Sequence, residues 1–310
     1  MEEKCIIGSY EFLPVLRVMK EHSRLYTRIF ALAFLLGAGF WLRSLDPEKF
    51  GLTAAWRPWA RTTIVNLYFS DGRFLVPVSR AMPMNDDLPR ATLQALLAGP
   101  KPGSGLKSSI PRGVEIRSLK IESGVTRVDL SAAILDGEDE TAETAIIETM
   151  TALPGVNSIV LSADGKSFTS LARRKPLLYY ASATGLAAVP VSATGPRAAL
   201  ELYLSGPTAS DLAGLPSDIG FPVYEYNGRD GLLSLKFAYT PSIRTMAVEK
   251  PHRVRLVLLG LIASLTEFSE VRAVQLDFGG QTRLGLGQCS DLLRTPQARP
   301  QLLNDERLLD

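Results

Sequence analysis

The sequence has few of the side chains from which metal sites and disulfide frameworks are built. Its 310 residues include two cysteines and two histidines. A structural or catalytic zinc site needs about three or four such ligands gathered in one place. Cys5 and Cys289 fall on opposite sides of a membrane in the topology predicted below, so they form no intrachain disulfide. Oxidation is therefore not expected to hold this fold together.

An excess of charge of one sign is also missing. The chain has 34 Lys and Arg residues against 32 Asp and Glu, a net charge of +2, and the basic residues are spread along the sequence. Nucleic-acid binding relies on a concentrated basic surface that neutralises phosphates, so nucleic acid is excluded as a partner. Apolar residues are plentiful by comparison. At 46% hydrophobic composition, the 310 residues suffice for about two ordinary domains.

The two histidines have no companions suited to catalysis. His22 lies in a segment predicted to be cytoplasmic, and His252 follows Pro251 beside Arg253. Neither has a nucleophile or a further metal ligand near it in the sequence. We therefore expect no catalytic, metal-binding or cofactor-binding residues, and a protein that is not an enzyme.

Three further stretches imitate functional motifs. The acidic run 136–143 does not match the spacing of a calcium-binding loop and precedes a predicted helix, where carboxylates favour the helix dipole. The Gly-Gly-Gln within 277–281 falls at the end of a predicted strand and indicates a turn. The basic run 172–176 predicts a solvated linker between two domains, with contact to anionic phospholipid or wall polymer as the alternative.

The N-terminal part contains one long apolar run. Residues 29–42 are uncharged and lie between Arg28 and Arg43. If these arginines extend toward the two interfaces, residues 25–45 form a helix of roughly 30 Å, enough for one pass through a bilayer. A buried core helix is disfavoured because apolar residues cover every face of the run. We predict a transmembrane signal anchor at 25–45.

The flanking charges predict the orientation of this anchor. Lys20, Arg24 and Arg28 precede the run, whereas after it Asp46 and Glu48 offset Arg43 and Lys49. The N-terminal side is therefore the positive, cytoplasmic side. Residues 1–24 are then a short cytoplasmic segment. The bulk of the chain is extracytoplasmic and held at the cell membrane by a single pass.

Two alternatives at this end stay open. A cleavable signal peptide would use the small residues at 37–39, which leaves a very short apolar region before the cleavage site. Either Met1 or Met19 begins a plausible leader. No cysteine directly follows the apolar run, so we expect no lipidated cysteine in place of the anchor.

A repeated helix is the clearest feature of the rest of the chain. Residues 89–100 (PRATLQALLAGP) return as 196–207 (PRAALELYLSGP), identical at seven of twelve positions. Leu93 and Leu97 recur at the matching positions of the second copy and predict one apolar face. Each copy opens with Pro and closes with Gly-Pro, which fits the first turn and the end of a helix.

Other elements repeat in the same order. The matching segments are a hairpin at 67–79 and 178–192, a hairpin turning at Ser123-Gly124 and at Asn227-Gly228, a helix at 141–153 and 254–268, and a closing strand. The apolar stretch 254–265 is too short for a second membrane span and is expected to be a buried helix. We predict an α+β fold of two tandem β-β-α-β-β-α-β repeats, each a small layer of mainly antiparallel sheet covered by two helices.

The motifs of the first copy resemble the GerMN domain family of sporulation and spore germination proteins. Those that carry the resemblance, in order, are LVPVSR, LLAGP, IPRGVEI, VTRVDLS, ETMTALPGV and SIVLSADG. The resemblance extends over 62–166 and more weakly over 177–281. It implies a first GerMN-like domain at 62–170, a second, divergent one at 171–285, and a C-terminal tail at 286–310.

The resemblance also implies a function. It implies a place outside the cytoplasmic membrane of a spore-forming bacterium, where the protein supports the assembly of a transenvelope complex and catalyses no reaction. We expect a membrane-anchored assembly factor whose partners are envelope or sporulation-complex proteins, or further copies of itself. The alternative is an accessory module that binds peptidoglycan beside a cell-wall hydrolase. The copies differ where Lys236 replaces Asp129, so any role of that aspartate is not shared.

Overall fold

The computed structural model describes residues 61–136, 141–279, 286, 289–306 and 309. They belong to one compact unit, Arg61–Asp310. The predicted anchor at 25–45 lies outside the described residues. Among the residues that are described, no helix is long and apolar enough to cross a membrane.

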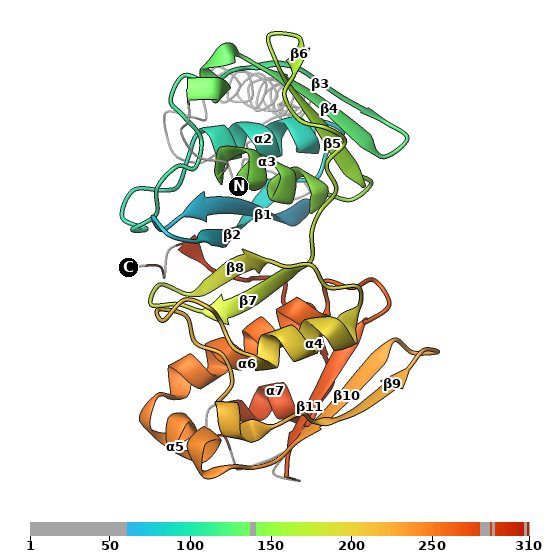
Figure 1. Cartoon of the computed structure of the whole chain (residues 1–310). Coiled ribbons are helices and arrows are strands. Elements are labelled where there is room, and N and C mark those ends of the chain that lie inside the picture. Colours follow the sequence, from blue (N-terminus) through green and yellow to red (C-terminus); the bar gives the residue numbers. More distant parts are fainter. Residues whose placement is uncertain (1–60, 137–140, 280–285, 287–288, 307–308, 310) are drawn as a thin grey trace, which may run out of the picture. The chain divides into compact units, whose positions relative to one another are not determined.

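The two copies follow one another along the chain (Figure 1). The first comprises β1 (Thr62–Ser70), β2 (Leu75–Pro83), α2 (Leu88–Leu97), β3 (Ile116–Glu122), β4 (Val125–Leu130), η2 (Ala132–Asp136), α3 (Thr141–Thr151), β5 (Ser158–Ala163) and β6 (Lys166–Ser167). The second comprises β7 (Leu177–Ala181), β8 (Leu186–Pro190), α4 (Pro196–Leu204), η3 (Ser217–Ile219), β9 (Val223–Asn227), β10 (Leu232–Phe237), α5 (Pro241–Glu249), α6 (Pro251–Leu265), β11 (Ala273–Phe278), α7 (Ser290–Arg294) and β12 (Gln297–Ala298). The α+β class and the repeated order are confirmed. The second copy adds α5 before α6, and α7 and β12 fall within the predicted tail, 286–310.

The strands are divided among the sheets differently from the prediction. The first hairpins of both copies join in one sheet of order β1-β2-β8-β7, while the other strands form the sheets β3-β4-β5-β6 and β12-β11-β10-β9. The pairs β4–β5 and β10–β11 are parallel, because a helix lies between the two strands and returns the chain to the same end of the sheet. Each copy therefore has its own four-stranded core sheet plus a hairpin in a shared sheet.

The predicted turns form where glycine allows them. Ser123 and Gly124 both have positive φ, 50° and 79°, as a two-residue hairpin turn requires. In the second copy the strands end at Asn227 and resume at Leu232, so the turn is longer than the predicted Asn227-Gly228 pair.

The repeated helix packs as an amphipathic element, with a small shift of its buried face. Leu93 and Leu96 are fully buried, whereas Leu97 is half-buried. In α4 the matching buried pair is Leu200 and Tyr203. On a helix, the residues three and four positions after Leu93 both lie on the same face as Leu93. The core contacts the residue three positions on, Leu96, rather than the predicted Leu97.

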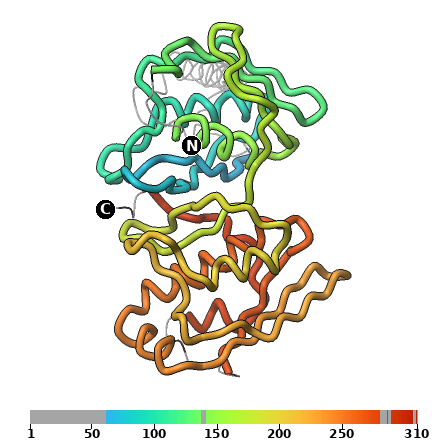
Figure 2. The backbone as a smooth tube through the Cα atoms, in the orientation of Figure 1, coloured from blue at the N-terminus to red at the C-terminus, as the bar shows by residue number. Residues whose placement is uncertain are grey.

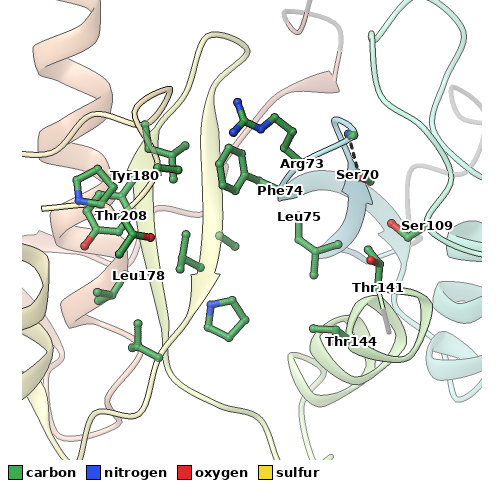
Figure 3. Close-up of a pocket in the computed structure, with 18 of the residues that line it drawn as sticks. Ser70, Arg73, Phe74, Leu75, Ser109, Thr141, Thr144, Leu178, Tyr180 and Thr208 are labelled. Carbon is green, nitrogen blue, oxygen red and sulfur yellow. Dashed lines mark hydrogen bonds between the residues drawn. The ribbon is translucent and has the colours of Figure 1, made fainter. Parts of the chain in front are cut away.

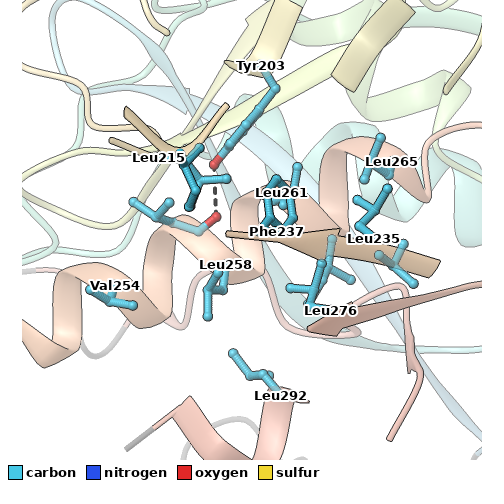
Figure 4. Close-up of a cluster of buried hydrophobic side chains, with 14 of the residues drawn as sticks. Tyr203, Leu215, Leu235, Phe237, Val254, Leu258, Leu261, Leu265, Leu276 and Leu292 are labelled. Atoms are coloured by element: carbon cyan, nitrogen blue, oxygen red, sulfur yellow. Dashed lines mark hydrogen bonds between the residues drawn. The ribbon is translucent and has the colours of Figure 1, made fainter. Parts of the chain in front are cut away.

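The apolar stretch 254–265 forms most of the buried helix α6, as predicted. It lies against β7 so closely that a Cβ on Gly260 would run into the Tyr179 carbonyl oxygen. The hydroxyl of Tyr203 on α4 donates to the Val257 carbonyl, 2.8 Å away, within a cluster that includes Leu258 and Leu261 (Figure 4). These contacts join α4, α6 and the second copy's sheet into one core.

Candidate functional site

Of the histidines and cysteines, the structure describes His252 and Cys289. His252 is exposed in the first turn of α6. Cys289 is buried, and burial raises the pKa of its thiol to about 11, so it is not a reactive thiolate at neutral pH. His22 and Cys5 lie outside the described residues. Within the described ranges no three His, Cys, Asp or Glu side chains come together as a metal site would require.

The motif-like stretches take structural positions where they are described. Glu143 lies in the first turn of α3, as expected for a carboxylate near a helix N-terminus. Residues 137–140 of the acidic run, and Gln281 of the Gly-Gly-Gln motif, lie outside the described residues. Gly279 follows β11 with φ of 60°, which favours the turn interpretation.

Asp129 stabilises a turn in the first copy only. Its carboxylate accepts hydrogen bonds from the Gly165 N–H and the Ser162 hydroxyl, each at 2.8 Å, and these donors lower its pKa. Its counterpart Lys236 instead pairs with Glu225 across β9 and β10, at 3.0 Å. The substitution thus exchanges one local contact for another.

The basic run between the copies contains one residue for which the solvated-linker prediction was wrong. The Arg174 side chain is 24% exposed and pairs with the buried carboxylates of Glu148, at 3.2 Å, and Glu267, at 3.0 Å. Glu148 lies on α3 and Glu267 follows α6. Two buried carboxylates from different copies need a cation, and the connecting segment supplies it.

Two tyrosines and a second arginine complete this interdomain cluster. The Tyr179 hydroxyl donates to Glu267 at 2.7 Å and lies 3.2 Å from the Tyr68 hydroxyl, and Arg299 also pairs with Glu267. Burial, opposed by Arg174 and reinforced by Glu267, raises the pKa of Glu148 to about 7. Because these groups satisfy one another, the cluster joins the copies rather than offering a reactive group.

A groove opens between the copies on another part of the shared sheet. Its volume is about 760 Å³, within the range of roughly 300–1,000 Å³ typical of ligand sites, which often lie at domain interfaces. Figure 3 shows Tyr180 and Thr208 on one side, Ser109 and Thr141 on the other, and Phe74 between them. Sequence reasoning did not find this groove, since it depends on how the two copies pair.

The outer edges of the shared sheet are covered. The Tyr68 N–H of β1 donates to the Thr149 hydroxyl at 3.2 Å, and the Tyr179 N–H of β7 donates to the Ser264 hydroxyl at 2.8 Å. One residue of each edge strand also bridges to a loop, Ser70 to Lys107 and Ala181 to Ala213.

The core sheets end differently. Among the described strands, none pairs with the outer edge of β3 or β9. β3 has a register irregularity between Ile116 and Ser118 and exposes Lys120, two features that discourage edge pairing. β9 pairs regularly with β10 and exposes Val223 and Tyr226. It is the less protected edge.

Comparison with known proteins agrees with this architecture. The family model described as "Germane: Sporulation and spore germination" matches residues 66–169. The tandem GerMN domains of the sporulation protein GerM from Bacillus subtilis match with a TM-score of 0.58 and 17% sequence identity, covering 79% of this chain and 99% of that chain. No curated protein matches.

Two partial matches are too weak in TM-score to carry an argument. The first GerMN domain of the same Bacillus subtilis protein gives 0.30 at 13% identity, covering 43% of this chain and 94% of that one. A lipoprotein from Clostridium perfringens, described as putative, gives 0.26 at 22% identity, covering 42% and 87%. At these identities the structural likeness shows the fold alone: the chain has the fold of two tandem GerMN domains, and its residues 66–169 match the Germane family model.

Proposed function

We propose that this chain is a non-catalytic assembly factor of the cell envelope in sporulation or germination, held at the membrane by residues 25–45. The family match at 66–169 supports the sporulation context. The hydropathy of 29–42 and the charges around it support the anchor. Among the described residues, His252 is exposed and burial raises the pKa of the Cys289 thiol to about 11, which favours a binding role over an enzymatic one.

The open edge of β9 is the observation that carries the binding role. Val223 is 57% exposed and Tyr226 42% exposed, on a regular strand with an unpaired outer side within the described structure. Such an edge accepts a strand from a partner through main-chain hydrogen bonds, with side-chain contacts providing specificity. The edges of β1 and β7 are already covered by other parts of the chain, so the shared sheet is a poorer place for a partner strand than β9.

Adjacent proline substitutions test strand addition at β9. Neighbouring residues on a strand point their N–H groups to opposite sides. Proline has no N–H, so one of the two variants Tyr224→Pro and Glu225→Pro loses a hydrogen bond to β10, and the other loses a donor on the open edge. We expect one variant to unfold more easily and the other to keep its stability while losing its envelope partner in a pull-down. Equal partner binding by the stable variant and the parent would contradict this contact mode.

A wall assay separates the proposal from its rivals. The purified chain should leave a suspension of peptidoglycan turbid. Lysis of the wall would show an enzyme. Tight sedimentation with the wall, without lysis and without a protein partner, would instead favour the accessory module of a cell-wall hydrolase.

Membrane topology is tested with a reporter fused after Asp310, which should be active only outside the cytoplasm. Cytoplasmic activity of the fusion would refute the anchored orientation.

A further inference from the structure

The two copies meet at equivalent residues. In the repeat, Leu75 of β2 corresponds to Ala188 of β8, because both precede Val-Pro-Val-Ser, and these two residues pair with each other. The order β1-β2-β8-β7 is unchanged when the copies are exchanged. The two copies are therefore related by an approximate twofold arrangement about the Leu75–Ala188 pair. A site on one side of this pair has an equivalent site, formed by the matching residues of the other copy, on the opposite side.

On one side the C-terminal segment runs beside β2 and β8 (Figure 2), and Asn304 binds the backbone of both strands. The Asn304 side-chain amide donates to the carbonyls of Pro77, at 2.7 Å, and Leu186, at 2.9 Å, and its oxygen accepts from the Leu186 N–H at 2.8 Å. The Ser79 N–H donates to the Asn304 carbonyl at 3.0 Å. The Asn304 side-chain amide thus makes the hydrogen bonds that a backbone peptide group would make between β2 and β8.

Two residues later an ion pair holds the same segment. Glu306 accepts two hydrogen bonds from Arg80, at 2.7 and 2.9 Å, and a further one from the Lys101 N–H. The Glu306 side chain is 2% exposed. Burial raises its pKa, but these donors outweigh burial and lower it overall, so the carboxylate is ionised at neutral pH.

The groove occupies the equivalent position on the other side. The repeat pairs Pro77 with Pro190 and Lys101 with Thr208, and both Pro190 and Thr208 line the groove. The Val191 N–H donates to the Pro176 carbonyl beside β7, so the alternation of the strand turns the Pro190 carbonyl toward the groove. This carbonyl matches the one that Asn304 binds at Pro77.

The groove differs from the occupied side in its charge. Ala193 stands in the repeat where Arg80 stands in the first copy, so the arginine that holds Glu306 has no equivalent. Of the two cations that line the groove, Arg73 is already paired with Asp211 and Lys107 is exposed to solvent. Phe74 and Val189 add apolar surface to the lining.

We propose that this groove is a peptide-binding site for an extended, largely apolar segment of another protein, with a side-chain amide that donates to the Pro190 carbonyl. The bound segment lies beside the shared sheet as the C-terminal segment does on the opposite side. The groove is separate from the β9 edge, and peptide binding in it does not depend on the membrane anchor or on a sporulation role. This proposal and the proposed function can therefore fail independently of each other.

The test uses the purified full chain and a fluorescein-labelled peptide with the sequence of residues 301–310 carrying E306L. The chain's own C-terminal segment keeps the occupied side filled because its tether gives a high effective concentration. Fluorescence anisotropy should show saturable binding. Thr208→Trp, at an exposed rim position, should weaken it by about tenfold or more. Ser118→Trp, exposed on β3, is the matched control and should leave it unchanged.

A second peptide and a cross-link locate the binding. The peptide that also carries N304A should bind several times more weakly, because it lacks the amide donor. A benzophenone-bearing peptide should cross-link to residues 188–191 or 205–209. Absence of saturable binding, binding indifferent to Thr208→Trp, or cross-linking to 77–80 would each overturn the proposal.

Discussion

Replacing Asn304 with alanine tests whether the C-terminal segment holds the two copies together. The change removes three hydrogen bonds to the backbone of Pro77 and Leu186, and Leu186 is fully buried. A buried backbone group left without a partner costs about 1–3 kcal/mol, and water entering the vacated space satisfies part of the demand. We expect N304A to lower the free energy of unfolding by about 2–5 kcal/mol.

Two companion variants sharpen this measurement. N304D keeps an acceptor for the Leu186 N–H but places a carboxylate against two carbonyl oxygens, so it should cost at least as much as N304A. Leu302→Ala, at a side chain that is 55% exposed, should change stability by no more than about 0.5 kcal/mol. Urea unfolding of the fragment 61–310, followed by circular dichroism, gives the comparison at constant m-value. If N304A behaves like the Leu302 variant, the segment is not a structural link.

Three further changes test other parts of the account. Leu93→Ala should cost about 2–5 kcal/mol in urea unfolding, and more than Leu97→Ala, whose side chain is only half-buried; the reverse order would contradict the burial of α2. The pKa of Glu148 is raised from 4.5 to about 7 in the folded state, so between these pH values the folded state binds more protons than the unfolded state. The free energy of unfolding should therefore fall by at most roughly 3 kcal/mol as pH rises across that window. Glu148→Gln should flatten this dependence, and an unaltered pH profile would refute it. Aspartate at Leu35 and Leu36 should release the chain from the membrane or block its export, at roughly 2.5–3.5 kcal/mol per charge; unchanged membrane fractionation would argue against the anchor.

Local sequence signals predicted the elements and their order. Proline and Gly-Pro marked the repeated helix, and the glycine at 124 marked a turn that forms where expected. The internal repeat gave each predicted element independent support, because the two divergent copies show the same elements in the same order. These signals act within a few residues of one another, which is why they are readable in a single sequence.

The contacts between the copies were not readable in this way. Nothing local distinguishes Arg174 from its basic neighbours, and its buried partners lie on α3 and after α6. Glu148, within the apolar stretch IIETM, was the available hint of a buried ion pair. The joining of the first hairpins and the place of Asn304 depend on distant segments, so the groove between the copies was missed as well.

Site-specific photocross-linking in cells tests the central claim, that this chain acts through protein contacts at its open edge, most directly. A photoreactive amino acid at Val223 on β9 should give a discrete cross-linked product with an envelope protein or a second copy. The same amino acid at Val248 on α5, where the side chain is 78% exposed, should give none. No product from Val223 during growth or sporulation, or the same product from both positions, would contradict the account.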